Sequence, residues 1–136
     1  MKTWIFFLIP LIFLVSCKEE EEDNCAESIV CSDVFISISV NIKDSDGEAV
    51  VLDEFYTFID SRTKIELDRS DFQIEKGIYP VATDANEDLI DFEGTNVVFV
   101  GKMDGENVIE HPMIIGKDCC HIKLIQGEEE IIIDEL

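Results

Sequence analysis

Apolar and polar side chains alternate along residues 34–42 with a period of two, which is the spacing of a β-strand with one buried face. Further extended runs, rich in β-branched and aromatic side chains, follow at near-regular spacing with turn-forming residues between them. These runs are residues 49–52, 54–60, 78–83, 96–101, 107–115, 119–125 and 130–133. Since no sustained 3.6-residue period accompanies them, the pattern predicts an all-β protein, a small antiparallel β-sandwich.

Aspartate, asparagine and glycine mark the turns between the predicted strands. Asp104-Gly105 is the strongest hairpin signal, because these residues adopt the backbone angles of a tight two-residue turn. Other turns are predicted at residues 44–47, 76–77, 84–87 and 126–127. Residues 62–74 give no clear prediction, since apolar positions alternate there only in short stretches.

The first 16 residues follow a different pattern. A short basic start at Lys2 is followed by an unbroken apolar run of 12 residues from Trp4 to Val15. A membrane-spanning helix needs about 20 apolar residues, and Pro10 would interrupt a helix in the middle of this run. The pattern is typical of a signal peptide, so residues 1–16 are predicted to be cleaved.

The run ends in Leu14-Val15-Ser16-Cys17, which resembles the lipobox of bacterial lipoproteins. The resemblance implies that Cys17 becomes the mature N-terminus and carries a diacylglyceryl group and an amide-linked acyl chain. Each buried methylene contributes about 0.8 kcal/mol and a single acyl chain binds only marginally. Several chains on one residue would therefore anchor the protein permanently.

Residues 17–28 are predicted to be a disordered tether, because the like charges of its acidic run repel and extend the chain. A basic residue followed by acids directly after the cysteine is similar to the surface-export signal of Bacteroidota lipoproteins. The resemblance implies that Lys18, Glu19 and Glu20 direct the protein to the cell surface, on the outer face of the outer membrane. The periplasmic face remains the alternative. Residues 29–136 then form the single β-sandwich domain.

The net charge restricts the partners. The chain has 31 acidic and 10 basic residues and a formal net charge of −21. Removal of Lys2 with the signal peptide brings the charge to −22, because no acidic residue is removed. Such a field repels phosphate backbones, so nucleic acid is excluded as a partner. The simplest interpretation of the acidic surface is that it keeps the protein soluble. The protein is expected to bind the membrane through the lipid on Cys17 and not through its charge.

Five cysteines leave an even number once Cys17 is assigned to the lipid. The remaining four lie in a compartment that permits disulfides, and they are Cys25, Cys31, Cys119 and Cys120. Neighbours on a strand point to opposite faces, so a bond between the two adjacent cysteines would distort the peptide. Both disulfides should therefore join the segment of Cys25 and Cys31 to the strand of Cys119 and Cys120, in a pairing that stays open.

Strand alternation also predicts which side chains of this strand face the core. Cys120 should lie with Ile122 and Leu124 on the apolar face. The outward-facing side chains should be those of Cys119, His121 and Lys123.

Metal binding is the alternative for these residues and for two acidic loops. Zinc could use the four cysteines and His121, but their spacing lacks a Cys-x-x-Cys pair. Calcium could use Asp44, Asp46 and Glu48, or Asp84, Asn86 and Asp88. Neither loop has the EF-hand register, and turns use the same residues, so no metal or other cofactor is expected. Thiolate catalysis is disfavoured because the two histidines, His111 and His121, lie in no recognisable nucleophile motif.

Residues 40–50 resemble the opening hairpin of carboxypeptidase regulatory-like domains, and Gly77-Ile78-Tyr79 is similar to a Gly-x-Tyr pattern of that family. The resemblance implies a transthyretin-like sandwich that serves as an accessory or binding module. An immunoglobulin-like sandwich is the other form of the expected fold. The adjacent cysteines near the C-terminus are outside the family's pattern.

Two functional hypotheses follow. The first is a binding or structural module, not an enzyme, that contacts an envelope protein or a glycan. Tyr56 and Tyr79 are contact residues if they are exposed and core residues if they are not. The second is a small carboxylate-dependent hydrolase, which requires a cleft with two convergent carboxylates. A calcium-binding surface protein is a further alternative.

Overall fold

The computed structural model describes residues 25–134 except 26–27, 66, 68 and 70–71. The predicted signal peptide, Cys17 and the export residues Lys18, Glu19 and Glu20 lie outside the described residues. The described chain forms strands and two short 3-10 helices in the following order. They are β1 Ser37–Asp44, β2 Glu54–Ile59, β3 Thr63–Ile65, η1 Ile74–Lys76, β4 Ile78–Thr83, η2 Asp84–Leu89, β5 Thr95–Met103, β6 Glu106–Lys117, β7 Ile122–Gln126 and β8 Glu130–Ile133.

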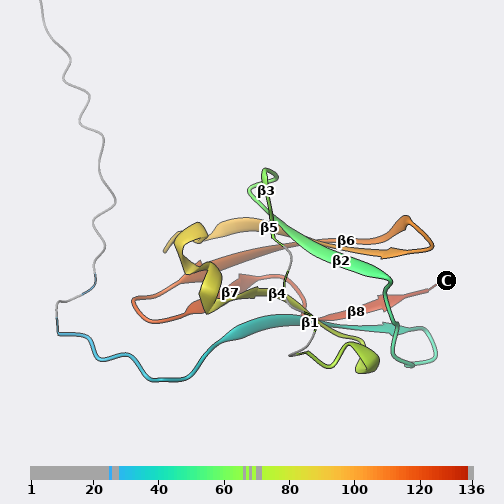
Figure 1. The fold of residues 1–136 in the computed structure, drawn as a ribbon, viewed down its shortest axis with the longest axis horizontal. Helices are drawn as coiled ribbons and strands as arrows, with labels where there is room; N and C mark the ends of the chain where they lie inside the picture. The colour runs from blue at the N-terminus through green and yellow to red at the C-terminus, as the bar shows by residue number, and fades with distance from the viewer. Residues whose placement is uncertain (1–24, 26–27, 66, 68, 70–71, 135–136) are drawn as a thin grey trace, which may run out of the picture.

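The strands form two sheets that pack face to face, so the predicted all-β sandwich is confirmed (Figure 1). The smaller sheet has the order β4-β1-β8, and the larger has the order β3-β2-β5-β6-β7. The long hairpin of β5 and β6 turns at Asp104-Gly105, as the sequence predicts. No helix formed by the described residues is long and apolar enough to cross a membrane.

One strand pair is parallel. β8 runs alongside β1 from the pair Asn41–Glu130 to the pair Asp44–Ile133. Lys43 Nζ lies 2.8 Å from Glu130 Oε2 and adds an ion pair to this edge. Side-chain alternation is the same in parallel and antiparallel strands, so the pattern alone does not show this orientation.

The core lies between the two sheets and is built from the alternating apolar positions. β1 contributes Ile38, Val40 and Ile42, which are 5%, 0% and 0% exposed. Aromatic rings fill the centre, where the ring centroids of Phe55 and Tyr79 lie 5.1 Å apart. This is the apolar face that the alternation along residues 34–42 predicts.

Both tyrosines considered as contact residues are buried. Tyr79 is 0% exposed and belongs to the core. Tyr56 is 9% exposed and follows Phe55 on β2, so its ring lies on the outer face of the larger sheet. Lys64 Nζ lies 4.2 Å from the centroid of that ring. Neither residue offers an exposed aromatic surface to a partner.

Some element boundaries differ from the prediction. β1 begins at Ser37 because its pairing with β4 begins there, opposite Thr83. Val34 and Phe35 lie beyond that partner strand and are 58% and 64% exposed. The turn predicted at residues 84–87 is the start of η2, whose capping box joins Thr83 and Asn86. The undefined stretch 62–74 contains β3 and the start of η1.

Candidate functional site

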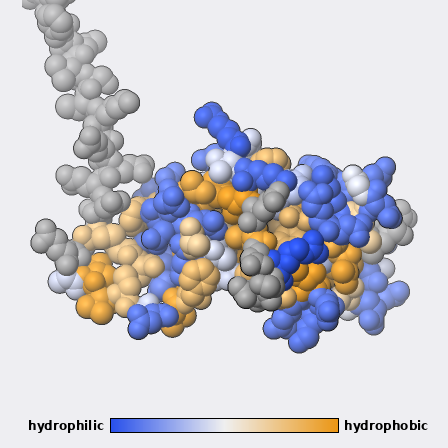
Figure 2. Space-filling view, in the orientation of Figure 1, coloured by the Kyte–Doolittle hydropathy of each residue, from blue (hydrophilic) through white to orange (hydrophobic). Residues whose placement is uncertain are grey.

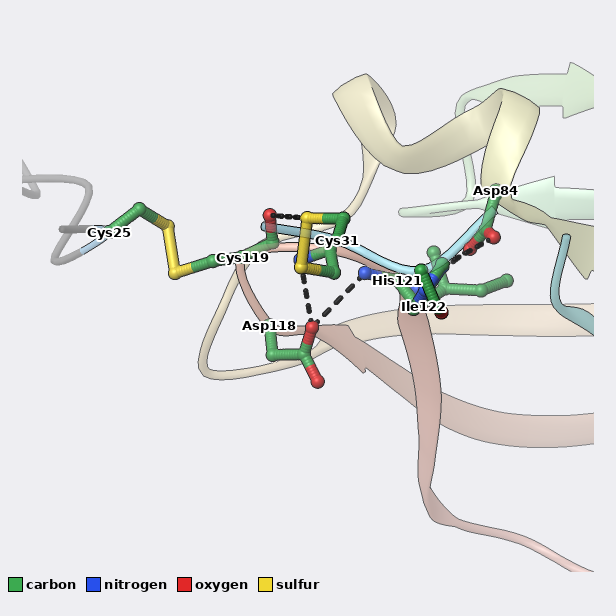
Figure 3. The surroundings of a disulfide bond; sticks show 9 residues. Cys25, Cys31, Asp84, Asp118, Cys119, His121 and Ile122 are labelled. Atoms are coloured by element: carbon green, nitrogen blue, oxygen red, sulfur yellow. Dashed lines mark hydrogen bonds and ion pairs between the residues drawn. A yellow bond between two sulfur atoms is a disulfide. The ribbon is translucent and has the colours of Figure 1, made fainter. Parts of the chain in front are cut away.

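Two disulfides fasten the N-terminal segment to the loop before β7. Cys25 bonds to Cys119 and Cys31 bonds to Cys120, across sequence separations of 94 and 89 residues (Figure 3). The prediction that both bridges join these two segments is confirmed, and the structure supplies the pairing. Residues 28–36, before β1, are thereby held against the end of the sandwich where β7 begins.

The adjacent cysteines lie in a bend and not on the predicted strand, which begins only at Ile122. Asp118 organises this bend, because its Oδ1 accepts the backbone N–H groups of Cys120 at 2.9 Å and His121 at 3.0 Å. These two hydrogen bonds lower the pKa of Asp118 despite a smaller opposing effect of burial. The predicted in-and-out alternation is therefore wrong for residues 119–121.

From Ile122 onward the alternation holds. Ile122 is 2% exposed and belongs to the core, whereas Lys123 is exposed and Leu124 is half-buried. The side-chain hydrogen bonds of Asp118 bend the backbone before Ile122, and side chains in a bend do not alternate between two faces. The alternation is therefore lost only within the bend. Cys119 and Cys120 are both half-buried as a result.

The metal alternatives find little support in this arrangement. The four cysteine sulfurs are bonded in pairs, so they are not the free thiolates that zinc requires. Asp44 Oδ1 accepts the N–H groups of Asp46 at 3.0 Å and Glu48 at 2.9 Å, which makes this loop an aspartate-stabilised turn. The described residues contain no group of three or more histidine, cysteine or acidic side chains arranged to hold a metal ion.

The second acidic loop serves a different purpose. Asn86 Oδ1 accepts the backbone N–H of Thr83 at 3.0 Å and caps η2. Asp84 turns toward the disulfide-bonded end, where its Oδ2 lies 2.8 Å from His121 Nδ1 (Figure 3). The relative exposures of these two side chains are 12% for Asp84 and 21% for His121. His121, predicted to face outward, is thus a partly buried partner of Asp84.

Asp84 is held rigidly by backbone donors from two sides. Its Oδ2 accepts the N–H of Ile36 at 2.8 Å, and its Oδ1 accepts the N–H of Ile122 at 3.0 Å. Burial raises the pKa of Asp84, but these two hydrogen bonds and His121 together outweigh it and leave the pKa below its ordinary value. Asp84 is therefore ionised at neutral pH.

Ser32 completes a hydrogen-bonded chain. Its Oγ lies 3.2 Å from His121 Nε2, and the side chain is exposed. The Asp84 carboxylate can only accept a hydrogen bond, so it places the proton of a neutral His121 on Nδ1. Nε2 then carries the lone pair and accepts a hydrogen bond from the Ser32 hydroxyl group. Ser32, His121 and Asp84 thus stand in the relative positions of a serine, its base and the carboxylate that orients the base.

Sequence reasoning missed this chain because no local motif contains it. His121 lies 89 residues from Ser32 and 37 residues from Asp84. The one available signal was the cysteine pattern, since a bond between the segments of Cys31 and Cys120 brings their neighbours Ser32 and His121 together. The other histidine is used differently, because His111 Nε2 donates to the carbonyl oxygen of Glu128 at 3.0 Å.

Two surface depressions bear on the carboxylate-hydrolase alternative. One is lined by Ile59, Asp60, Arg62, Thr63 and Leu89. The other is lined by Arg69, Phe72, Gln73, Ile74, Glu75 and Lys76. Each contains one carboxylate, whereas the glycosidase mechanism needs two that face a common bond. Neither depression has the arrangement that this alternative requires.

Exposed apolar side chains gather on the same N-terminal segment. Val30 is 93% exposed, and Ile29 and Phe35 are 46% and 64% exposed. Figure 2 shows hydrophobic surface at the left end of the molecule, where Figure 1 draws the segment that leads into β1. The segment thus combines two disulfides, the exposed Ser32 and an apolar surface.

Comparisons with protein-family models, with curated proteins and with solved structures find no significant match to this chain.

Proposed function

We propose that this chain is an envelope lipoprotein whose β-sandwich is a binding or structural module held close to the outer membrane. The observation that carries the proposal is the pair of disulfides at the N-terminal end of the domain. They lie where the predicted tether meets the sandwich, and disulfides persist in the compartment that a signal peptide implies. The lipobox resemblance of residues 14–17 supports the anchor.

The position of the first disulfide limits how far the domain stands from the lipid. Seven residues separate Cys17 from Cys25, and a fully extended chain spans at most about 3.5 Å per residue, or about 28 Å in all. Tension on the anchor would enter the domain at Cys25 and pass through the Cys25–Cys119 bond to the loop before β7. β1 would not bear that load alone, so the fold is protected at its attachment point.

The exposed apolar side chains of residues 28–35 support contact with another envelope protein. A contiguous apolar surface is unusual on a soluble domain and is typical of an interaction site. The strong acidic charge of the chain favours a partner with a basic rim around its apolar centre. A glycan ligand remains the second possibility for such a module.

The anchor is tested by mass spectrometry of the N-terminal peptide of the membrane-extracted protein. We expect the peptide to begin at Cys17 and to carry fatty acids. Cys17→Ser should abolish the modification and release an unprocessed or soluble form, whereas the control Ser16→Ala keeps a small residue before the cysteine and should remain acylated. A native protein that begins elsewhere without fatty acid contradicts the proposal.

Surface display is tested separately with antibody labelling of intact and permeabilised cells. We expect the native protein to be labelled on intact cells. Joint replacement of Lys18, Glu19 and Glu20 by alanine should remove this labelling while the protein stays acylated. Labelling only after permeabilisation would place the protein on the periplasmic side.

A further inference from the structure

We propose that Ser32 is an activated nucleophile that transfers acyl groups from small carboxylic esters, with His121 as its general base and Asp84 as the residue that orients the base. The proposal rests on the hydrogen-bonded chain Ser32–His121–Asp84 and is independent of the lipid anchor. The two distances are 3.2 Å from Ser32 Oγ to His121 Nε2 and 2.8 Å from His121 Nδ1 to Asp84 Oδ2. Both lie within the reach that a nucleophile and its base require.

The orientation of the base supports this assignment. Asp84 is fixed by the backbone N–H groups of Ile36 and Ile122, so its carboxylate keeps its direction without help from a substrate. His121 is fixed at its own backbone, where its N–H donates to Asp118 Oδ1 at 3.0 Å. The imidazole is therefore anchored both at the main chain and at Nδ1, and Nε2 faces the serine.

The Cys31–Cys120 disulfide holds the nucleophile in place. Ser32 directly follows Cys31, which is bonded to Cys120, and His121 directly follows Cys120. One disulfide thus fixes the backbones of the nucleophile and the base relative to each other. Ser32 is exposed on the N-terminal segment, so an ester carbonyl in solution can approach its hydroxyl group.

The chemical step balances without a cofactor. Ser32 Oγ attacks the ester carbonyl carbon as its proton moves to His121 Nε2, and the carbonyl electron pair moves to the oxygen. The tetrahedral intermediate collapses, its bond to the alkoxy oxygen breaks, and the alcohol leaves with the proton from Nε2. Water then attacks the acyl-serine with His121 again as base, which releases the carboxylic acid and restores Ser32.

The first test is covalent labelling of the mature, disulfide-bonded protein with a fluorophosphonate, followed by peptide mass spectrometry. We expect an adduct on Ser32 that forms roughly a hundredfold faster than one on Ser45, the usual range for a positioned general base. Ser45 is an exposed serine in the turn after β1 and serves as the internal control. Equal labelling of the two serines would overturn the proposal.

The second test follows p-nitrophenyl acetate hydrolysis by variants at the three positions. Ser32→Ala removes an exposed hydroxyl group and leaves the Cys31–Cys120 disulfide intact. We expect its hydrolysis rate to equal the rate in buffer alone. His121→Gln keeps a polar side chain but no base, and should lower the labelling rate by roughly a hundredfold. A His121→Gln protein that labels as fast as the wild type, or a Ser32→Ala protein that still hydrolyses the ester, refutes the assignment.

The role of Asp84 in orienting the base is tested by a measurement that a purely structural role would leave unchanged. The amide nitrogen of Asp84→Asn would donate to Nδ1 and shift the histidine proton to Nε2, where it blocks the base. We expect kcat for p-nitrophenyl acetate to fall by at least tenfold with KM unchanged, in samples whose circular dichroism and disulfide content match the wild type. An unchanged kcat in such folded samples removes Asp84 from the mechanism.

Discussion

The phenol oxygen of Tyr79 in β4 lies 2.7 Å from the backbone nitrogen of Leu52 and accepts its hydrogen bond inside the core. The same hydroxyl group donates to the carbonyl oxygen of Val50 at 2.8 Å. One side chain of the smaller sheet therefore satisfies a donor and an acceptor of the connection that leads from β1 to β2. Burial raises the pKa of Tyr79 despite the hydrogen bond from Leu52, so the phenol stays neutral and can donate at physiological pH.

The first prediction concerns this phenol. Tyr79→Phe keeps the ring in the core but leaves the buried N–H of Leu52 and the carbonyl of Val50 without a partner. An unsatisfied buried polar group costs about 1–3 kcal/mol, so we expect the free energy of unfolding to fall by about 2–4 kcal/mol. Urea denaturation with the disulfides intact measures the change. Tyr56→Phe, which keeps the ring that Lys64 contacts, should change it by less than about 1 kcal/mol.

The second prediction concerns the two disulfides, whose effects should not add. Each alone closes a loop of about 90 residues, worth about 4.5 kcal/mol in the chain-entropy model. Once one bond exists, the other closes a ring of only about nine residues and adds about 2.5 kcal/mol. Replacing either pair by serine should therefore cost about 2.5 kcal/mol, and replacing both about 7 kcal/mol. Urea denaturation of the three variants measures these losses, and a double loss equal to the sum of the single losses would contradict the model.

Much of the fold is readable from the sequence because it depends on local rules. The extended run between two predicted turns predicts Ile78–Thr83 with the bounds that β4 has, and Asp104-Gly105 predicts the hairpin of β5 and β6. Strand ends are less predictable because they depend on where the partner strand ends. Val34 continues the alternation but lies outside β1, since the pairing with β4 begins at Ser37.

The candidate site is predictable only in part. The even number of cysteines left after Cys17, together with strand geometry, predicts the link between the two segments. The partnership of Asp84 with His121 depends on how η2 and the loop before β7 meet in space. A sequence pattern carries no information about such a contact, so aspartate in a turn and histidine on a strand were the natural interpretations.

The third prediction concerns the pH dependence of Asp84. Its folded-state pKa lies below its ordinary value, so the folded protein binds this proton less readily than the unfolded chain does. The ionised carboxylate therefore adds to the free energy of unfolding. This contribution is fully present above the ordinary aspartate pKa of about 4 and is lost as the pH falls through the lower folded-state pKa. Asp84→Asn cannot ionise, and we expect it to be less stable by about 2 kcal/mol at pH 7.

Urea denaturation of the wild type and Asp84→Asn at a series of pH values measures this difference. The gap between the two free energies of unfolding should be constant above about pH 5 and should narrow below about pH 4. A gap of the same size at pH 7 and at pH 3 would show that the charge of Asp84 does not stabilise the fold.

The fourth prediction compares two glycines with positive φ. Gly77 follows η1 with φ of +74°, its N–H donates to the carbonyl of Ile74, and an added Cβ would collide with the carbonyl oxygen of Ile42. Gly47 has φ of +82° in the turn after β1, and an added Cβ would meet nothing within 4 Å. Gly47→Ala should therefore cost only the left-handed backbone strain of about 1–2 kcal/mol. Gly77→Ala must also displace the β1 backbone and should cost about 1–3 kcal/mol more. Thermal and urea unfolding of both variants measure the difference, and equal losses would mean that the approach of Gly77 to β1 is looser than the structure indicates.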